Sequence, residues 1–162
     1  CRFFNSFGPG EVPGQYRNVI PNFIYWSQND IPIPITGDGN ETRDFTYVLD
    51  LVQGLIKSCY SNQASGKSFN LASGRETKII DVKKKIDKLL GKENIIKYKS
   101  VRKWDTKRRL LASINLAKKT FGYNPLVGFD EGLSLNINWF SENKEIIDKA
   151  TDFPPGMSSA IR

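Results

Sequence analysis

The chain has 162 residues, of which 39% are hydrophobic, and it carries a formal net charge of +7. This composition is typical of a single globular domain and excludes a disordered chain. Because the sequence has no His and only two Cys, it excludes His-based acid–base catalysis and makes a zinc site or a disulfide framework improbable. No apolar run approaches the roughly 20 residues of a membrane span and no signal peptide is evident, so we expect a cytoplasmic protein without a membrane partner.

The first half of the chain predicts one helix between two extended segments. Residues 1–4 read as a strand that runs into the turn Gly8-Pro9-Gly10. Asn18 to Asn29 suits a helix, since a Pro falls in its first turn and apolar residues recur on one face. Ile31 to Thr36 alternates Ile with Pro, and because Pro lacks an N–H donor this segment can form only an edge strand. Gly37 to Asn40 is a turn by composition.

The second half predicts more helix than strand. From Val48 to Cys59, apolar residues recur at helical spacing, which predicts a helix with Cys59 on its apolar face as a buried free thiol. Further strands are predicted at residues 68–72 and 95–98, and further helices at residues 77–90, 114–121 and 130–140. The pattern is α/β or α+β with few strands, which suggests an incomplete sheet.

The positive charge is concentrated between residues 83 and 119, which hold fourteen Lys or Arg against three Asp or Glu. Such a concentration can signify a nucleic-acid surface, a site for an anionic small molecule, or a solvated helix face. We predict that Lys83, Lys84 and Lys85 lie on a solvated face. A nucleic-acid partner is disfavoured because the cations are not interleaved with stackable aromatic residues.

Three charged residues carry candidate anion chemistry. A flexible turn delivers Arg43 to the start of an element, where its planar guanidinium could clamp a phosphate bidentately. Arg102 and Asp105 could hold a phosphate and a ribose hydroxyl, respectively. Taken alone, each is equally consistent with a surface ion pair or a solvated basic loop.

Several short motifs follow one another in a fixed order. They read RFFNSFGP at residues 2–9, VIPNFI at residues 19–24, ITGDG at residues 35–39, TRDFTYV at residues 42–48 and FNLASG at residues 69–74. The first is similar to the pattern R-x-x-N-x-[YF]-G-P of the extended short-chain dehydrogenase/reductases, the NAD-dependent nucleotide-sugar epimerases and dehydratases. Over roughly residues 1–142, the chain looks closest to members similar to UDP-glucose 4-epimerase, although decarboxylases and dehydratases share most of these motifs.

The resemblance implies an α/β fold, namely the C-terminal substrate-binding portion of such an enzyme with edge strands of its Rossmann sheet. Residues 1–150 would form this portion and residues 151–162 a tail. The sequence has neither the Gly-rich loop for NAD nor the Tyr-x-x-x-Lys pair that transfers protons, so we expect a missing N-terminal part to bind most of the NAD. The chain alone is then expected to be inactive, within a homodimeric parent that interconverts UDP-sugars through a transient 4-keto intermediate. A non-catalytic nucleotide-sugar-binding module is the alternative.

The resemblance also implies roles for individual residues. Asn5 matches a residue that binds the pyrophosphate or the sugar of the substrate, and Phe4 matches a position beside the nicotinamide of NAD. The remaining substrate-binding positions are those that open the first helix, those of the strand that lines the base, and those of the phosphate and ribose contacts. They are Asn18, Val19, Pro34, Ile35, Thr36, Arg43, Arg102 and Asp105. No metal ligands and no catalytic residues are expected in this chain.

Overall fold

The computed structural model describes residues 1–15, 17–101, 103, 106–151 and 153. Its helices are α1 (Val19–Gln28), α2 (Val48–Cys59), α3 (Ile79–Leu90), α4 (Asn115–Phe121), α5 (Phe129–Glu142) and α6 (Lys144–Ala150), with a 3-10 turn at Asn62–Ala64. Each predicted helix is present, with its ends shifted by a few residues. Among the described residues, no helix combines the length and the apolarity that crossing a bilayer requires.

The strands are short and mostly parallel. They are β1 (Arg2–Phe3), β2 (Ser6–Phe7), β3 (Ile33–Thr36), β4 (Thr42–Arg43), β5 (Thr46–Tyr47), β6 (Asn70–Leu71), β7 (Thr77–Lys78), β8 (Ile96–Lys99) and β9 (Arg109–Leu110). β1 pairs with β6, β2 with β5 and β3 with β8, all parallel, whereas β4 lies between antiparallel β7 and parallel β9. The result is the mixed α/β architecture that the sequence predicted.

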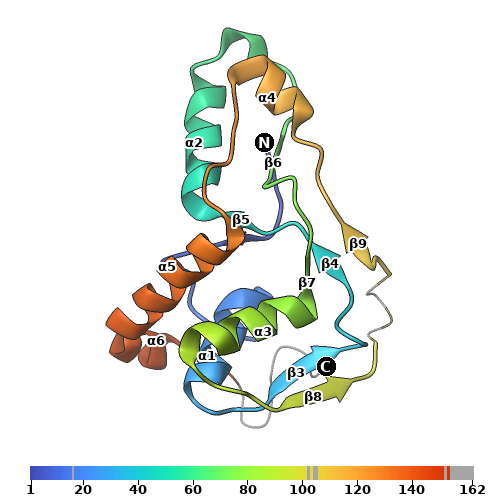
Figure 1. The fold of residues 1–162 in the computed structure, drawn as a ribbon. Coiled ribbons are helices and arrows are strands. Elements are labelled where there is room, and N and C mark those ends of the chain that lie inside the picture. Colours follow the sequence, from blue (N-terminus) through green and yellow to red (C-terminus); the bar gives the residue numbers. More distant parts are fainter. Residues whose placement is uncertain (16, 102, 104–105, 152, 154–162) are drawn as a thin grey trace.

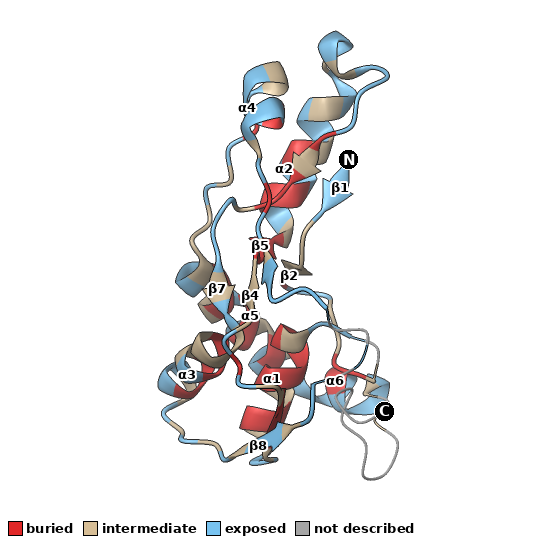
Figure 2. Cartoon of the chain, turned by 90° about the vertical axis from the view of Figure 1, so that its right-hand side faces the viewer, coloured by how far each residue is buried: buried red, intermediate tan, exposed pale blue. Residues whose placement is uncertain are grey.

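Buried side chains form two clusters, one at each end of the molecule (Figures 1 and 2). The larger cluster lies where α1, α3 and α5 pack around β3, and it includes Phe23, Ile35 and Leu133. The smaller one lies between α2, α4 and β6, around Leu71 and Tyr123. The short strands β4, β5, β7 and β9 lie between the two ends. Polar residues on these linking strands are therefore close to both clusters.

Helix α2 packs through a narrower face than its apolar pattern predicted. Leu51 and Gly54 are buried, but Val52 and Ile56 are 41% and 52% exposed, and Cys59 is an exposed free thiol. The prediction that Cys59 is buried is therefore wrong. The helical spacing identified the apolar residues correctly, but only the Leu51 side of the helix has a packing partner among the described residues.

Gly54 allows α2 to approach its neighbours closely. A Cβ atom at this position would lie 2.8 Å from the Tyr123 ring and 3.0 Å from Leu71 Cδ1. We expect Gly54→Ala to lower the free energy of unfolding by about 1–3 kcal/mol through overpacking, even though Ala favours a helix by about 1 kcal/mol. Urea denaturation measures the effect, with Gln53→Ala on the exposed face as the control. A higher unfolding free energy in Gly54→Ala would contradict the prediction, because it would show that the Tyr123 ring can move to accommodate the methyl group.

The second correction concerns Lys83, which is buried rather than solvated. Its ammonium forms an ion pair with Asp87 one helical turn later, and the two side chains are only 8% and 9% exposed. Asp87 also accepts hydrogen bonds from the backbone and side chain of Asn94, at 3.3 and 2.9 Å. Lys84 follows the prediction, with a side chain that is 69% exposed. One of the three lysines thus belongs to the interior because α3 turns that face toward the segment before β8.

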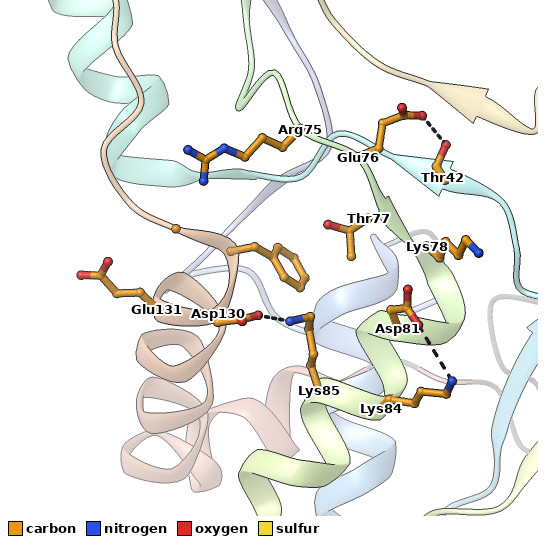
Figure 3. Close-up of a pocket in the computed structure, with 12 residues that line it drawn as sticks. Thr42, Arg75, Glu76, Thr77, Lys78, Asp81, Lys84, Lys85, Asp130 and Glu131 are labelled. Carbon is orange, nitrogen blue, oxygen red and sulfur yellow. Dashed lines mark hydrogen bonds and ion pairs between the residues drawn. The ribbon is translucent and has the colours of Figure 1, made fainter.

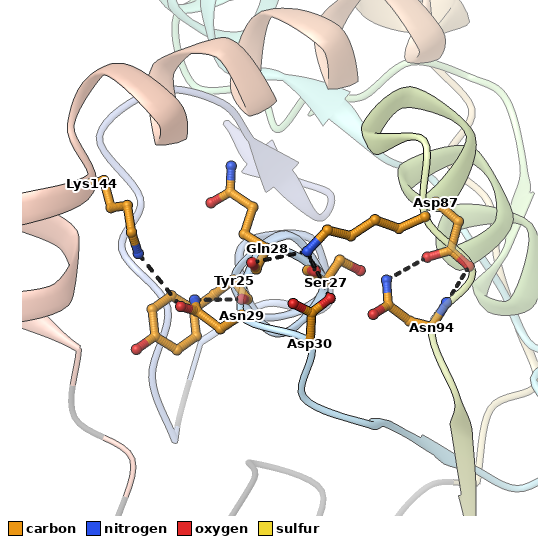
Figure 4. A network of polar contacts seen from close by, with 9 residues as sticks. Tyr25, Ser27, Gln28, Asn29, Asp30, Asp87, Asn94 and Lys144 are labelled. Carbon is orange, nitrogen blue, oxygen red and sulfur yellow. Dashed lines mark hydrogen bonds and ion pairs between the residues drawn. The ribbon is translucent and has the colours of Figure 1, made fainter.

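Lys92, which follows α3, binds the C-terminal end of α1 (Figure 4). Lys92 Nζ donates to the backbone oxygens of Ser27 and Gln28 at 3.1 and 3.2 Å, and it pairs with Asp30 at 2.7 Å. These oxygens belong to the last turn of α1, where free carbonyl groups favour a cation. The contact joins α1 to the segment that leads into β8, and so it fixes β8 beside β3.

Candidate functional site

The site is built around Asp44, a carboxylate that is 0% exposed. Its Oδ1 accepts hydrogen bonds from the Ser73 backbone at 2.9 Å and from the Ser73 hydroxyl at 2.6 Å. Its Oδ2 accepts from the backbone N–H groups of Gly74 at 3.0 Å and Ala112 at 3.3 Å. Four donors satisfy the buried charge, which holds three separate segments of the chain together.

Arg43 lies directly before Asp44, on β4. Its Nη1 donates to Thr42 O at 2.8 Å and to Arg108 O at 3.5 Å, so the guanidinium lies against the backbone of β4 and of the residue before β9. Neighbouring residues of an extended segment point to opposite sides, which allows Asp44 to face inward while Arg43 is only partly buried. The carboxylate of Asp44 is directed toward Ser73 and Ala112.

Asn5 is connected to the same segment. It adopts a left-handed backbone conformation with φ of 27°, which Asn tolerates better than most residues. Its Nδ2 donates to Asp44 O at 3.4 Å, and its own backbone oxygen accepts from Thr46 N at 3.2 Å. The pairing of β2 with β5 thus brings Asn5 next to Arg43, although they lie far apart in the sequence. Phe4, the residue before Asn5, is partly buried between β1 and β2.

Asn18 and Val19 open α1 close to this point. Asn18 is the N-cap residue, but its side chain makes no capping bond to the helix. Instead, Asn18 Nδ2 donates to Glu11 Oε1 at 2.8 Å and to Ser6 O at 3.4 Å. Burial raises the pKa of Glu11, while the bonds from Asn18 act in the opposite direction. The first turn of α1 therefore retains backbone donors that its own cap residue does not satisfy.

The strand β3 contains Pro34, Ile35 and Thr36. Ile33 N donates to Ile95 O and Gly37 N to Lys99 O, both at 2.8 Å, so the odd-numbered residues direct their backbone groups toward β8. Pro34 and Thr36 direct theirs toward the opposite edge, which explains why Pro34 is compatible with the ladder. β3 pairs only with β8 among the described residues, as expected for an edge strand. The side chain of Ile35 is 1% exposed and belongs to the core.

Arg102 and Asp105 lie outside the described residues. The residues that follow them are tied to the strands of the site. Arg108 binds both carboxylate oxygens of Asp38, at 2.9 and 2.8 Å, and Arg108 O accepts from Thr42 N at 2.8 Å. Arg108, directly before β9, is therefore attached to the turn after β3 and to the start of β4.

The ion pair between Asp38 and Arg108 predicts how the Asp38 carboxylate titrates in acid. The pKa of Asp38 is lowered from 3.8 to about 2, first by the backbone N–H of Asn40 and second by Arg108. The stability that this carboxylate contributes is present above its unfolded pKa and is lost as the pH falls toward 2. We expect Arg108→Gln to raise the pKa of Asp38 only part of the way, because the bond from Asn40 remains.

Carboxyl NMR titration measures this shift. Arg109→Gln is the matched control, because Arg109 pairs with Glu76 and lowers the pKa of that carboxyl to about 2. The control variant should raise the pKa of Glu76 and leave Asp38 unchanged. An Asp38 that titrates identically with and without Arg108 would contradict the bidentate contact.

A separate groove of about 770 Å³ lies between the amino-terminal ends of α3 and α5 (Figure 3). Its lining contains none of the predicted site residues. Several of its charged side chains are paired: Lys85 with Asp130, Lys84 with Asp81 at 4.0 Å, and Glu76 with Arg109. Within the described part of the chain, no group of three or more side chains could hold a metal ion.

The sequence reasoning did not assign a role to Asp44. Its side chain is nevertheless fully buried. One signal could have identified it: Asp44 immediately precedes Phe45, Thr46 and Tyr47, which are all buried. If the segment that Asp44 begins is buried, its carboxylate must be satisfied by hydrogen bonds or an ion pair.

Comparisons with known proteins match the chain to one family. Residues 1–72 match a family model described as the NAD dependent epimerase/dehydratase family. A UDP-glucuronate 4-epimerase of Thermodesulfobacterium geofontis is 34% identical over 90% of the chain and 44% of its own length. UDP-glucuronic acid decarboxylase 1 of Xenopus tropicalis is 35% identical over 90% of the chain and 34% of its own length.

Solved structures share the fold. An epimerase from Methanothermobacter thermautotrophicus superposes with a TM-score of 0.92 and 50% identity, covering 94% of the chain and 45% of that protein. A Bacillus cereus UDP-glucuronic acid 4-epimerase, solved with UDP-glucuronic acid and NAD, superposes with a TM-score of 0.79 and 26% identity over 87% of the chain and 44% of that protein. The chain thus spans less than half the length of these relatives, and the predicted fold class is confirmed.

Proposed function

Because the chain belongs to the NAD-dependent epimerase/dehydratase family, we propose that it is the substrate-binding half of a nucleotide-sugar epimerase whose ligand is a UDP-sugar. The observation that supports this proposal is that hydrogen bonds link the segments of Asn5, Asn18 and Arg43: Asn5 Nδ2 donates to Asp44 O, and Asn18 Nδ2 donates to Ser6 O. An amide, a helix start and a guanidinium are the groups that bind a diphosphate.

The nucleobase would lie along the open edge of β3. There, Thr36 presents a backbone N–H and a carbonyl oxygen, and Pro34 presents a carbonyl oxygen. Uracil offers carbonyl acceptors and one N–H donor, so its pattern complements this edge. Arg102 and Asp105 would complete the phosphate and ribose contacts. In this arrangement residues 1–150 form the binding portion and residues 151–162 a tail.

The residues of this chain do not form an NAD site on their own. Its sequence contains no Gly-rich phosphate loop and no Tyr-x-x-x-Lys pair, and only Phe4 falls at a proposed cofactor contact. When bound, NAD would accept and return the hydride of the sugar. We assign its binding mainly to a Rossmann part that this chain does not contain, and the role of the described residues is to hold the substrate.

Calorimetric titration of UDP into the folded chain tests the proposal. We expect saturable binding of UDP, weaker binding of CDP because the amino group of cytosine replaces an acceptor, and no interconversion of UDP-glucose and UDP-galactose with added NAD. A folded chain that fails to bind UDP at millimolar concentration would overturn the assignment. UDP binding with turnover by this chain alone would overturn the division of roles.

The reaction rather than the sugar separates an epimerase from a decarboxylase, since the matching relatives named for the two reactions are both named for UDP-glucuronate. Both would bind the diphosphate and the base through the same residues. We favour the epimerase because solved epimerases superpose on the chain over most of its length. UDP alone therefore tests the binding half, and the product that the full-length enzyme forms from UDP-glucuronate, either its 4-epimer or CO2 with a UDP-pentose, tests the reaction.

A further inference from the structure

We propose that Asp44 is a positioning residue that sets the geometry of the diphosphate site, an inference that rests on the proposed function. Asp44 would not touch the ligand. It would act by fixing three segments relative to one another, namely that of Arg43, that of Asn5 and the one after β9. Its carboxylate is itself held by four hydrogen bonds from Ser73, Gly74 and Ala112.

The first segment is that of Arg43 itself. A buried carboxylate with four donors cannot rotate or shift without leaving a charge unsatisfied, which costs several kcal/mol. Because Asp44 points inward, the adjacent Arg43 must leave the strand on the other side. The direction of the guanidinium is thus coupled to the burial of its neighbour.

The second segment is that of Asn5. Its amide donates to the backbone oxygen of Asp44 at 3.4 Å, and its carbonyl accepts from Thr46 N at 3.2 Å. Asn5 therefore takes its position from the backbone on either side of Phe45. Its left-handed conformation, at φ of 27°, persists only where surrounding contacts support it.

The third segment follows β9. Asp44 Oδ2 accepts from Ala112 N at 3.3 Å, and β9 pairs with β4 so that Leu110 lies opposite Arg43. The carboxylate of Asp44 therefore holds the strand that carries Arg43 against the segment after β9, whereas its four donors include no residue of β3.

That difference provides the test. In Asp44→Asn, one acceptor oxygen becomes an NH₂ donor, so two of the four donors lose their acceptor whichever way the amide is oriented. UDP and uridine are titrated into wild type and variant well below their melting temperatures. We expect the affinity for UDP to fall about tenfold relative to that for uridine, as one charge-assisted contact is lost.

Asp50→Asn is the matched control. Asp50 is 3% exposed and accepts backbone bonds from Leu126 and Val127 at 2.9 and 3.0 Å, but it contacts none of the three segments. Both variants should lower the melting temperature, and only Asp44→Asn should change the ratio of UDP to uridine affinity. An unchanged ratio in folded Asp44→Asn, or an equal change in Asp50→Asn, would overturn the inference.

Two further measurements keep the inference testable. If Asp44→Asn does not fold, Ser73→Ala removes only the hydroxyl donor and should reduce the ratio by ~3-fold, and no reduction would count against positioning. If wild type binds no UDP, the proposed function fails. Amide hydrogen exchange then tests separately whether Asp44 positions its neighbours. Thr46, whose N–H bonds to Asn5, should then exchange faster in Asp44→Asn but not in Asp50→Asn, and equal rates would refute the positioning role.

Discussion

Replacing Arg43 with Ala is expected to weaken UDP binding by roughly ten- to a hundredfold. The reason is that charge-assisted hydrogen bonds contribute on the order of 1.5–3 kcal/mol. Thr42 O and Arg108 O accept hydrogen bonds from one nitrogen of Arg43, Nη1, and a guanidinium binds two oxygens of a phosphate through a pair of parallel N–H groups. Calorimetric titration of UDP measures the loss directly.

Two further variants show whether a loss of affinity in Arg43→Ala is specific to the guanidinium at this position. Arg43→Lys should also lose affinity, because a point charge does not reproduce the two parallel bonds of a guanidinium. Lys119→Gln removes one positive charge from the exposed end of α4, remote from β4, and should leave the affinity unchanged. If Lys119→Gln weakened UDP binding as much as Arg43→Ala, diffuse positive charge rather than the Arg43 site would hold the anion.

Replacing Lys83 with Met is expected to lower the free energy of unfolding by about 3–5 kcal/mol, the usual cost of breaking a buried ion pair on one side. Asp87 would keep its bonds from Asn94 but would lose its only described cation, at a side chain that is 9% exposed. Urea denaturation monitored by circular dichroism gives the value. The measurement needs no change of pH, because the substitution itself removes the positive charge that compensates Asp87.

The neighbouring lysine provides the control for this prediction. Lys84→Met removes the same charge from α3, but the Lys84 side chain is 69% exposed and 4.0 Å from Asp81, so we expect a change of less than about 0.5 kcal/mol. The double variant Lys83→Met with Asp87→Leu should recover much of the loss, since neither charge then remains buried. Equal effects of Lys83→Met and Lys84→Met would show that the buried pair does not stabilise the fold.

The pattern of the sequence was sufficient for the elements that depend on neighbouring residues. The helix that became α1, the helix from Val48 to Cys59 and the edge strand that contains Pro34 follow from spacing and from the chemistry of Pro. Gly122 ends α4 at φ of 65°, where a residue without Cβ is favoured. The ordered motifs also predicted the family and the fold class, which the comparisons confirm. The assignment of individual binding residues stays a prediction.

Burial and long-range contacts were decided by the tertiary structure. Lys83 and Lys84 are adjacent and chemically identical, yet one is buried against Asp87 and the other is exposed. Cys59 lies on the apolar stripe of α2, but only the Leu51 side of that stripe is buried. Asp44 acquires its four donors from segments up to 68 residues away. Helical periodicity shows which side chains share a face, but whether a face is covered, and which distant donor satisfies a buried charge, depends on how β2, β4 and their partners pair in three dimensions.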